Sequence, residues 1–368
     1  MRRPAMARGG EPMTRPNYVI HGAGAIGSII GARLAEGGAR VQLVARGAHL
    51  EALSEHGLTM TGLTEGTFDL PASRQAHDLD LDADTVVLLA TKSGDTPATM
   101  AAHAEVYRDL PLVCCQNGVT NEIELAAGGF RVYGSTVLIG GAIETPGHVW
   151  HSAGHRLVIG RWPTGIDDVC QRLEADLANG GLDPRLHDEV RANKWGKLVR
   201  NLGNAFLALT DMSVQESTVD PENRWFSADV EEEAADVLEA AGIPYESMGR
   251  RSPREQIAHL RQEGTWERRD RGVPGTNSYP STWQDLTAGR PTVEVDHFNG
   301  AIVRLGEQFG IPTPLNRILR DLCDAAAARG LGPGGHSAAS LRAAAGAVGS
   351  PAASGATEDL DAVVEVED

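Results

Sequence analysis

The stretch that decides the fold of the first part of the chain is residues 18–27, Tyr18-Val19-Ile20-His21-Gly22-Ala23-Gly24-Ala25-Ile26-Gly27. Its apolar start predicts a buried strand, and residues 25–35 have the spacing of an amphipathic helix. In this strand–loop–helix context the pattern G-x-G-x-x-G allows a tight turn, close approach of a pyrophosphate and close helix packing. We therefore expect a dinucleotide to bind at the helix N-terminus. The expected contacts are Gly22, Ala23, Gly24, Ala25, Ile26 and Gly27.

The next 160 residues repeat the alternation of strand and helix. Apolar runs at residues 41–45, 85–90, 111–115 and 132–139 predict four more strands, with helical patterns between most of them. Such alternation is typical of a doubly wound, mostly parallel sheet. Residues 140–161 are rich in glycine and β-branched side chains, which predicts antiparallel strands closing the domain. We expect an α/β Rossmann domain over residues 17–185.

The period of the apolar residues changes after residue 186. Helical spacing appears at residues 190–209, 226–241, 295–309 and 314–328, which predicts an all-α C-terminal domain over residues 186–329. Between these helices, residues 245–280 are charged and turn-rich, and they are either a mobile flap or a solvated surface excursion. Residues 1–16 are interpreted as a disordered extension. Residues 330–368 have little apolar content beyond alanine and are expected to form a disordered acidic tail.

Composition restricts the class of partner. The chain has 368 residues, of which 41% are hydrophobic and 23% charged, and this is ordinary for a globular protein. The formal net charge of −17 argues against nucleic-acid binding through a phosphate-neutralising surface. No apolar run approaches the roughly 18 residues of a membrane span. We expect a cytoplasmic protein that binds neither nucleic acid nor membrane, and a homodimer remains open.

No metal site is expected. The four cysteines lack ligand spacing and are expected to be buried free thiols. His148, His151 and His155 could suggest a metal enzyme. They lie in a segment that predicts strands, without helical ligand spacing, and we interpret them as ordinary polar residues.

The end of the second predicted strand indicates which dinucleotide binds. Sites for NAD usually carry an acidic residue there, which bonds the ribose 2′-hydroxyl. Residues 41–46, Val-Gln-Leu-Val-Ala-Arg, contain no carboxylate, and Arg46 stands about where the acid would be. A guanidinium suits a 2′-phosphate, so NADPH is the expected cofactor. Lys92, just past the third strand, is a second cation at the same sheet edge, and a solvated loop lysine is an equally good interpretation.

Polar residues in unusual places suggest where chemistry occurs. Asn117 follows the fourth strand and is placed at the carboxyl edge of the sheet. Lys197, Asn201 and Asn204 form one stripe of a predicted helix, opposite an apolar stripe. Asparagine is a poor helix former, so a solvated face is a weaker interpretation than a face pressed against a ligand. Glu294 begins a later helix, where helix capping is its simplest role.

These motifs together resemble the ketopantoate reductase (2-dehydropantoate 2-reductase) family, from about residue 17 to about residue 328. The resemblance rests on GAGAIG, Arg46, QNG followed by Glu122, W-x-K-L-x-x-N, and the later S-x-x-Q-D, G-R-x-T and E-x-D-x-x-N-G motifs. It implies that Lys197 is the general acid and that Asn201 binds substrate. It further implies that Ser281 holds the substrate carboxylate and that Glu294 orients cofactor and substrate.

The same resemblance implies further contacts. Asn117 would touch both ligands, and Lys92 and Ala142 would line the cofactor site. Asn204, on the stripe with Asn201, is expected to help fix the substrate. The expected reaction is NADPH-dependent reduction of a small 2-oxo acid, foremost 2-dehydropantoate to pantoate. Two alternatives remain open: a paralogue that reduces another 2-oxo acid or an imine, and a non-catalytic dinucleotide sensor. The stripe containing Lys197 disfavours the sensor, because binding alone needs no proton donor.

Overall fold

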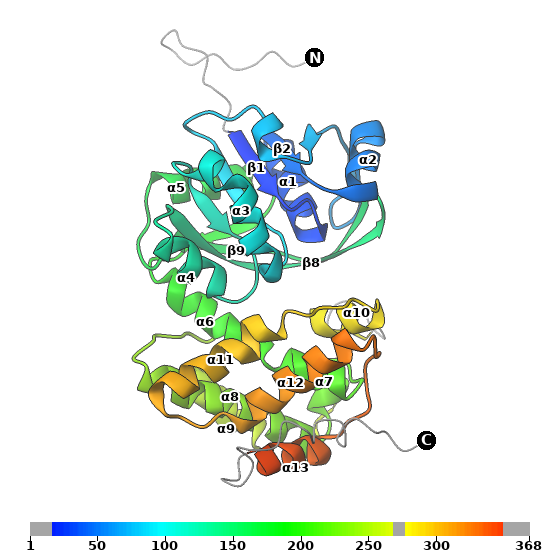
Figure 1. The fold of residues 1–368 in the computed structure, drawn as a ribbon, viewed down its shortest axis with the longest axis vertical. Helices are drawn as coiled ribbons and strands as arrows, with labels where there is room; N and C mark the ends of the chain where they lie inside the picture. Colours follow the sequence, from blue (N-terminus) through cyan, green and yellow to red (C-terminus); the bar gives the residue numbers. More distant parts are fainter. Residues whose placement is uncertain (1–16, 268–276, 349–368) are drawn as a thin grey trace. The chain divides into compact units, whose positions relative to one another are not determined.

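The computed structural model describes residues 17–267 and 277–348, which form two compact units (Figure 1). Among the described residues, the first unit comprises residues 17–116 and 121–190, and the second comprises residues 117–120, 191–267 and 277–348. The units therefore divide at residues 190 and 191, slightly later than the predicted boundary at residues 185 and 186. The sequence did not predict that residues 117–120 join the second unit. The predicted N-terminal extension, residues 1–16, lies outside the described residues.

The first unit is built on a ten-stranded sheet. Its strands are β1 (Asn17–His21), β2 (Arg40–Val44), β3 (Leu58–Gly62), β4 (Gly66–Phe68), β5 (Ala72–Ser73), β6 (Val86–Leu89), β7 (Leu112–Cys114), β8 (Val132–Thr145), β9 (His148–Arg161) and β10 (Asp183–Leu186). They lie in the order β4-β3-β9-β8-β7-β6-β1-β2-β5, with β10 beside β9. Only the pairs β8–β9 and β3–β4 are antiparallel among the described strands.

Helices cover both faces of this sheet. They are α1 (Ala25–Glu36), α2 (Gly47–His56), α3 (Thr96–Tyr107), α4 (Thr120–Ala127) and α5 (Asp168–Asn179). Alternate residues of β1 point to opposite faces: Ile20 packs with residues of α1 and α5, while Val19 packs with residues of α3 and α4. The continuous apolar run of β1 is explained because both faces are buried. The predicted doubly wound α/β domain is confirmed.

The second unit is helical. Its helices are α6 (Val190–Asn201), α7 (Gly203–Leu209), α8 (Pro221–Ala240), α9 (Pro253–Leu260), α10 (Ser281–Thr287), α11 (Val295–Phe309), α12 (Pro314–Ala328) and α13 (Ala338–Val348). Its described residues contain no strand, as predicted. The apolar stripe opposite Lys197 is buried; it consists of Leu198, Leu202, Phe206 and Leu209. The ring of Phe206 stacks on that of Phe226 at 4.5 Å between centroids.

One predicted helix is two helices in the structure. The expected helix at residues 190–209 divides at Leu202, where the Leu202 N–H donates to the Val199 carbonyl, three residues back. Asn201, Gly203 and Asn204 are poor helix formers, and their clustering explains the break. Asn201 therefore ends α6, and Asn204 lies in the first turn of α7.

The charged segment at residues 245–280 is partly an ordered, packed structure. Residues 253–260 form α9, whose apolar residues pack against α8. Arg254 pairs with Glu239 of α8 at 2.7 Å. The buried Arg224 donates to the Gln262 and Gly264 carbonyls, and its guanidinium lies 4.1 Å from the Trp266 ring centroid. Residues 253–266 are thus packed on α8, and residues 268–276 lie outside the described residues.

The prediction of a disordered tail from residue 330 is wrong for residues 330–348. Within α13, Ala338, Leu341 and Ala345 are buried along one face. Upstream, the Gly334 N–H donates to the Ala208 carbonyl at 2.9 Å, which ties this segment to α7. Alanine has the highest helix propensity, and buried alanines can form the apolar face of a helix. A low content of larger apolar residues therefore did not exclude an amphipathic helix. Residues 349–368 lie outside the described residues.

Candidate active site

The glycine-rich loop follows β1 directly and turns sharply. Gly22 has φ 103°, and a Cβ there would lie 2.6 Å from the Thr91 backbone nitrogen, so only glycine fits. The Gly22 and Ala23 N–H groups both donate to the Val44 carbonyl at the end of β2, at 3.1 and 3.0 Å. The turn is therefore held against the neighbouring strand, and α1 begins three residues later at Ala25.

The other two glycines fit a bound pyrophosphate. A Cβ on Gly24 would meet nothing within 4 Å, so the backbone before α1 is open to an approaching group. A Cβ on Gly27 would lie 2.3 Å from the Gly22 carbonyl oxygen and 2.9 Å from Ile20, so α1 packs directly on the loop. Open space at Gly24 and contact at Gly27 are what each position requires in a dinucleotide-binding turn. The amides of the first turn of α1 add an anion-binding dipole.

Two cations follow the strands on either side of β1. Arg46 comes two residues after β2 and Lys92 three residues after β6, and both strands pair with β1. Both side chains are exposed. Arg46 donates to the carboxylate of Asp95 at 2.9 Å. The structure thus brings both predicted cations to the edge of the sheet where the glycine loop lies.

Ala142 lies on β8, which passes the first turn of α1. A Cβ on its neighbour Gly141 would lie 2.5 Å from Ile29 and 3.8 Å from Ala25. Ala142 itself is exposed and stands opposite Trp150 of β9. The predicted cofactor residues of the first unit therefore share one region, around the start of α1.

A buried polar network supports the turn after β6, and the sequence did not predict it. The Asn121 side chain donates to Ser93 Oγ at 3.1 Å and accepts from Thr96 Oγ1 at 2.7 Å. Gln116 Nε2 donates to Thr96 Oγ1 at 3.1 Å. These four side chains are at most 5% exposed. They come from segments separated by about 20 residues or more, so no local pattern reveals them.

In the second unit, the Lys197 ammonium donates to Asn117 Oδ1 at 2.7 Å. Residues 117–120 leave the sheet after β7 and pack against α11. Gly118 has φ 80°, and a Cβ there would lie 3.0 Å from the His297 carbonyl oxygen. Thr120 Oγ1 lies 2.9 Å from His297 Nδ1. This short segment thereby brings Asn117 into hydrogen-bonding contact with Lys197 of α6. Both are predicted site residues, and the sequence placed Asn117 at the edge of the sheet.

The remaining predicted substrate residues lie on α6, α7 and α10. Lys197, Asn201 and Asn204 are each partly buried, and α7 packs against α10, which begins at Ser281. The α10 helix is fixed by Trp283, whose indole N–H donates to Asp211 Oδ1 at 2.7 Å. The structure thus places the predicted substrate residues on neighbouring helices of one unit.

Glu294 precedes α11 and is 9% exposed. Its side chain makes no capping hydrogen bond to that helix, so the simple capping interpretation does not apply. Its roles in binding cofactor and substrate stay predictions, as do the roles of the other site residues.

The three histidines considered as metal ligands have other partners. His151 Nδ1 lies 2.7 Å from Thr64 Oγ1, and its Nε2 lies 2.7 Å from the Gly154 carbonyl. His148 Nε2 lies 3.1 Å from Thr61 Oγ1, and the ring of His155 lies against that of His151. Across residues 17–267 and 277–348, no group of three or more His, Cys, Asp or Glu side chains is arranged to hold a metal ion. Within the same ranges, no helix is both long and apolar enough to cross a bilayer.

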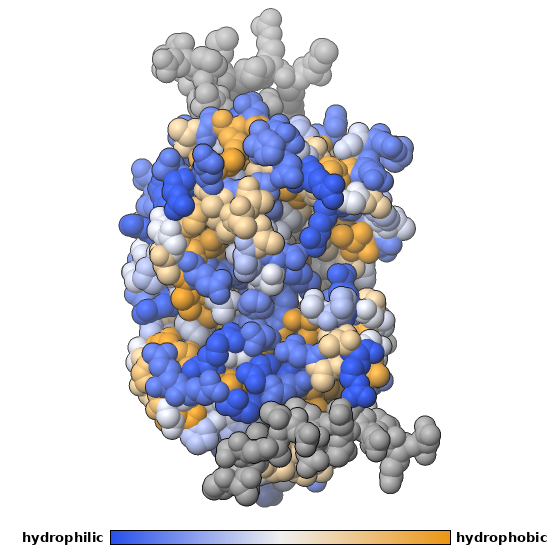
Figure 2. Space-filling view, in the orientation of Figure 1, coloured by the Kyte–Doolittle hydropathy of each residue, from blue (hydrophilic) through white to orange (hydrophobic). Residues whose placement is uncertain are grey.

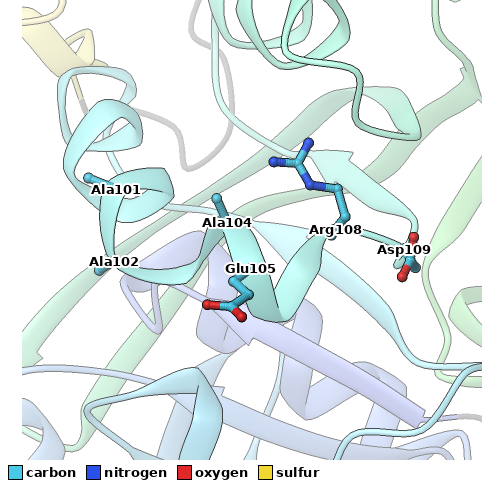
Figure 3. Close-up of a pocket in the computed structure, with 6 residues that line it drawn as sticks. All are labelled: Ala101, Ala102, Ala104, Glu105, Arg108 and Asp109. Carbon is cyan, nitrogen blue, oxygen red and sulfur yellow. The ribbon is translucent and has the colours of Figure 1, made fainter.

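An open hollow lies on the exposed face of α3 (Figure 3). It is lined by Ala101, Ala102, Ala104, Glu105, Arg108 and Asp109. Figure 2 shows small apolar residues gathered over α3, and Ala98, Ala101 and Ala102 are exposed there. None of the lining residues is a predicted site residue, and the hollow has no part in the candidate site.

Comparison with known proteins identifies the family. The model described as "Ketopantoate reductase PanE/ApbA" matches residues 18–164, and its C-terminal counterpart matches residues 189–327. The 2-dehydropantoate 2-reductase of Archaeoglobus fulgidus is 30% identical over 305 residues, covering 82% of this chain and 95% of that protein. The chain belongs to the ketopantoate reductase family. The resemblance stated from the sequence is confirmed. The prediction that the chain is an oxidoreductase acting on the CH–OH group of donors is confirmed as well.

Further relatives agree with this family. The Pyrococcus horikoshii 2-dehydropantoate 2-reductase is 28% identical over 306 residues, covering 82% of this chain and 94% of that protein. The solved PanE/ApbA family ketopantoate reductase of Ralstonia eutropha has a TM-score of 0.72 at 29% identity, covering 85% of this chain and 99% of that one. A D-mandelate dehydrogenase solved with NADH and anilino(oxo)acetate has a TM-score of 0.72 at 23% identity, covering 85% and 99%, and shares the fold.

Proposed function

We propose that this ketopantoate reductase family member reduces a small 2-oxo acid to the 2-hydroxy acid with NADPH, foremost 2-dehydropantoate to pantoate. One observation carries the proposal: the Lys197 ammonium is held at 2.7 Å by Asn117 within the helical unit. A dinucleotide sensor does not require a fixed proton donor such as Lys197 beside the predicted substrate residues of α6. An enzyme that must neutralise a developing alkoxide does.

The first unit would hold the cofactor. Its residues fit a dinucleotide, because Gly24 is open to an approaching pyrophosphate and Gly27 packs α1 onto the loop. Arg46 would bind the ribose 2′-phosphate through charge-assisted hydrogen bonds, and Lys92 would add positive charge at the same edge. Ala142 would line the site from β8. When bound, NADPH supplies the hydride.

The second unit would supply the proton and hold the acid. The Lys197 ammonium stabilises negative charge on the substrate carbonyl oxygen and donates the proton that completes the alcohol. Its hydrogen bond to Asn117 fixes the direction of the ammonium before substrate arrives. Asn201, Asn204 and Ser281 would orient the substrate, Ser281 through its carboxylate, and this orientation lowers the barrier by proximity. Glu294 would orient both ligands.

The proposal is tested first by turnover of the purified full chain. NADPH oxidation is followed with 2-dehydropantoate and with aliphatic, branched and aryl 2-oxo acids, and the products are identified by mass. We expect 2-dehydropantoate to give the highest kcat/KM. Binding of NADPH without oxidation by any 2-oxo acid or imine would favour the sensor.

The second test changes Lys197 to alanine. Turnover should fall by roughly two to four orders of magnitude, the range for a positioned general acid, with NADPH affinity unchanged. Arg329→Gln is the control, because it removes an exposed cation of the same unit, at the end of α12. A Lys197→Ala enzyme with wild-type turnover would exclude Lys197 as the proton donor.

A further inference from the structure

We propose that Asp95 is a specificity-determining residue of the proposed dinucleotide site, because its carboxylate competes with a ribose 2′-phosphate for the Arg46 guanidinium. The inference rests on the proposed function only in its cofactor site. The second strand has a cation, Arg46, and no acid at its end. The folded chain supplies an acid from the turn that follows β6, 2.9 Å from that cation.

The two residues come from opposite sides of β1. Arg46 follows β2, and Asp95 lies in a 3-10 turn, Ser93–Asp95, that follows β6. Because β1 pairs with both strands, the ion pair spans the end of β1, where the glycine loop begins. In a parallel sheet this edge is where a dinucleotide binds. The Arg46 side chain is 79% exposed, so an incoming phosphate can reach it.

The carboxylate of Asp95 does not have the structural role that its position suggests. Asp95 directly precedes α3, where an aspartate commonly accepts hydrogen bonds from the first backbone N–H groups. Its side chain makes no such bond and pairs with Arg46. Asp95 has helical φ and ψ of −84° and −13°, unlike the extended backbone of a typical capping residue, so its carboxylate is available to Arg46.

The backbone around Asp95 is firmly held. Ser93 and Thr96, on either side of it, both bond to the buried Asn121, and Thr96 also accepts from Gln116. The carboxylate is therefore presented to Arg46 by a fixed turn, which reduces the entropy lost on pairing. The Asp95 carboxylate is therefore already in place to compete with the 2′-phosphate when a dinucleotide binds.

The physical effect differs between the two dinucleotides. A 2′-phosphate carries close to two negative charges. The Asp95 carboxylate repels it and also neutralises part of the Arg46 charge that attracts it. A 2′-hydroxyl is neutral and can donate a hydrogen bond to that carboxylate. Asp95 should therefore weaken NADPH binding and spare NADH binding. The chain should prefer NADPH less strongly than Arg46 alone would dictate.

The experiment measures dissociation constants for NADPH and NADH with the full chain, by nucleotide fluorescence and without substrate. Asp95→Asn should tighten NADPH binding about fivefold, the scale of an exposed ion pair, and change NADH binding by less than about twofold. In an Arg46→Ala background, the selective gain should fall to within about twofold. The matched control is Asp80→Asn, which breaks a similar exposed pair with Arg40 at the other end of β2.

Each outcome decides the inference. If Asp95→Asn leaves the NADPH to NADH ratio unchanged, or weakens NADPH, then Asp95 does not compete with the phosphate. An equal gain in Asp80→Asn would reduce the effect to net charge and overturn the inference. Binding measured in this way is independent of turnover. A chain that binds NADPH selectively but reduces no 2-oxo acid would contradict the proposed reaction and leave the role of Asp95 standing.

Discussion

At the residue scale, the decisive contacts join side chains that are distant in sequence. Asn117 and Lys197 are 80 residues apart, yet they meet at 2.7 Å because residues 117–120 pack with the helical unit. Arg46 and Asp95 are 49 residues apart and meet across the end of β1. The sequence identified Lys197, Arg46 and Asn117 as candidate site residues. Only the folded structure shows that Asn117 contacts Lys197 and that Asp95 contacts Arg46.

Glu231 on α8 leads to a prediction about pH. Burial raises the pKa of its carboxyl to about 7, and Arg200 opposes the shift. The unfolded chain has the ordinary value near 4.5. Because the folded-state pKa is raised, the stabilisation is complete below the unfolded value and is lost as pH rises through about 7. We expect the free energy of unfolding to decrease by up to about 3 kcal/mol from about pH 5 to about pH 8 on this account.

Urea unfolding across this pH range checks the prediction. Glu231→Gln should flatten the dependence, because the amide stays neutral at every pH. Glu222→Gln, an exposed acid on the same helix, should leave the slope unchanged. An equal slope in the wild type and in Glu231→Gln would show that this carboxyl is not the cause.

At the element scale, α13 and the segment before it extend beyond residue 327, where the C-terminal family model ends. Arg342 of α13 forms an ion pair with Asp229 of α8, and its guanidinium lies 5.3 Å from the Phe226 ring centroid. Leu341 is fully buried. Together with the hydrogen bond from Gly334 to α7, these contacts make α13 part of the helical core.

Truncation after Gly330 should therefore destabilise the protein. Loss of the buried face of α13 costs about 2–3 kcal/mol, which corresponds to a fall in Tm of about 5–10 °C for a unit of this size. Truncation after residue 348 is the control, because it keeps α13 and removes a segment poor in large apolar side chains. Calorimetry of both truncated chains makes the comparison. Equal Tm values would show that α13 adds no stability.

At the scale of the whole molecule, the proposed roles are divided between the two units. The glycine loop, Arg46, Lys92 and Ala142 belong to the first, whereas Lys197, the substrate asparagines and Ser281 belong to the second. Asn117 and Glu294, each predicted to touch the cofactor as well, also belong to the second. Residues predicted for one ligand alone, such as Arg46 for the cofactor and Asn201 for the substrate, should therefore have separable effects.

Additivity tests this division. Arg46→Ala should lower kcat/KM for NADPH, and Asn201→Ala should mainly raise the KM of the 2-oxo acid. Because the two residues belong to different units and share no partner, their free-energy effects should add within about 0.5 kcal/mol in the double variant. Steady-state kinetics of the four proteins measures the coupling. A coupling well above that limit would show that the two positions act together.

The sequence alone determined the features that depend on local periodicity. The G-x-G-x-x-G loop, the parallel strands and the change to helical spacing after residue 186 are patterns of neighbouring residues, and the structure reproduces them. The sequence also determines the chemical type of the candidate site residues. A guanidinium at residue 46 and a lysine at residue 197 are visible in the chain itself.

Only the tertiary structure decided what surrounds those groups. Pairing across the sheet brought Asp95 to Arg46, and the excursion of residues 117–120 brought Asn117 to Lys197. The order of α13 depended on an apolar surface of α8 and α12 that covers its alanines. The physical reason is the same in each case. Local propensity acts over a few residues, whereas these contacts are selected by burial and charge between segments that meet only when the whole unit folds.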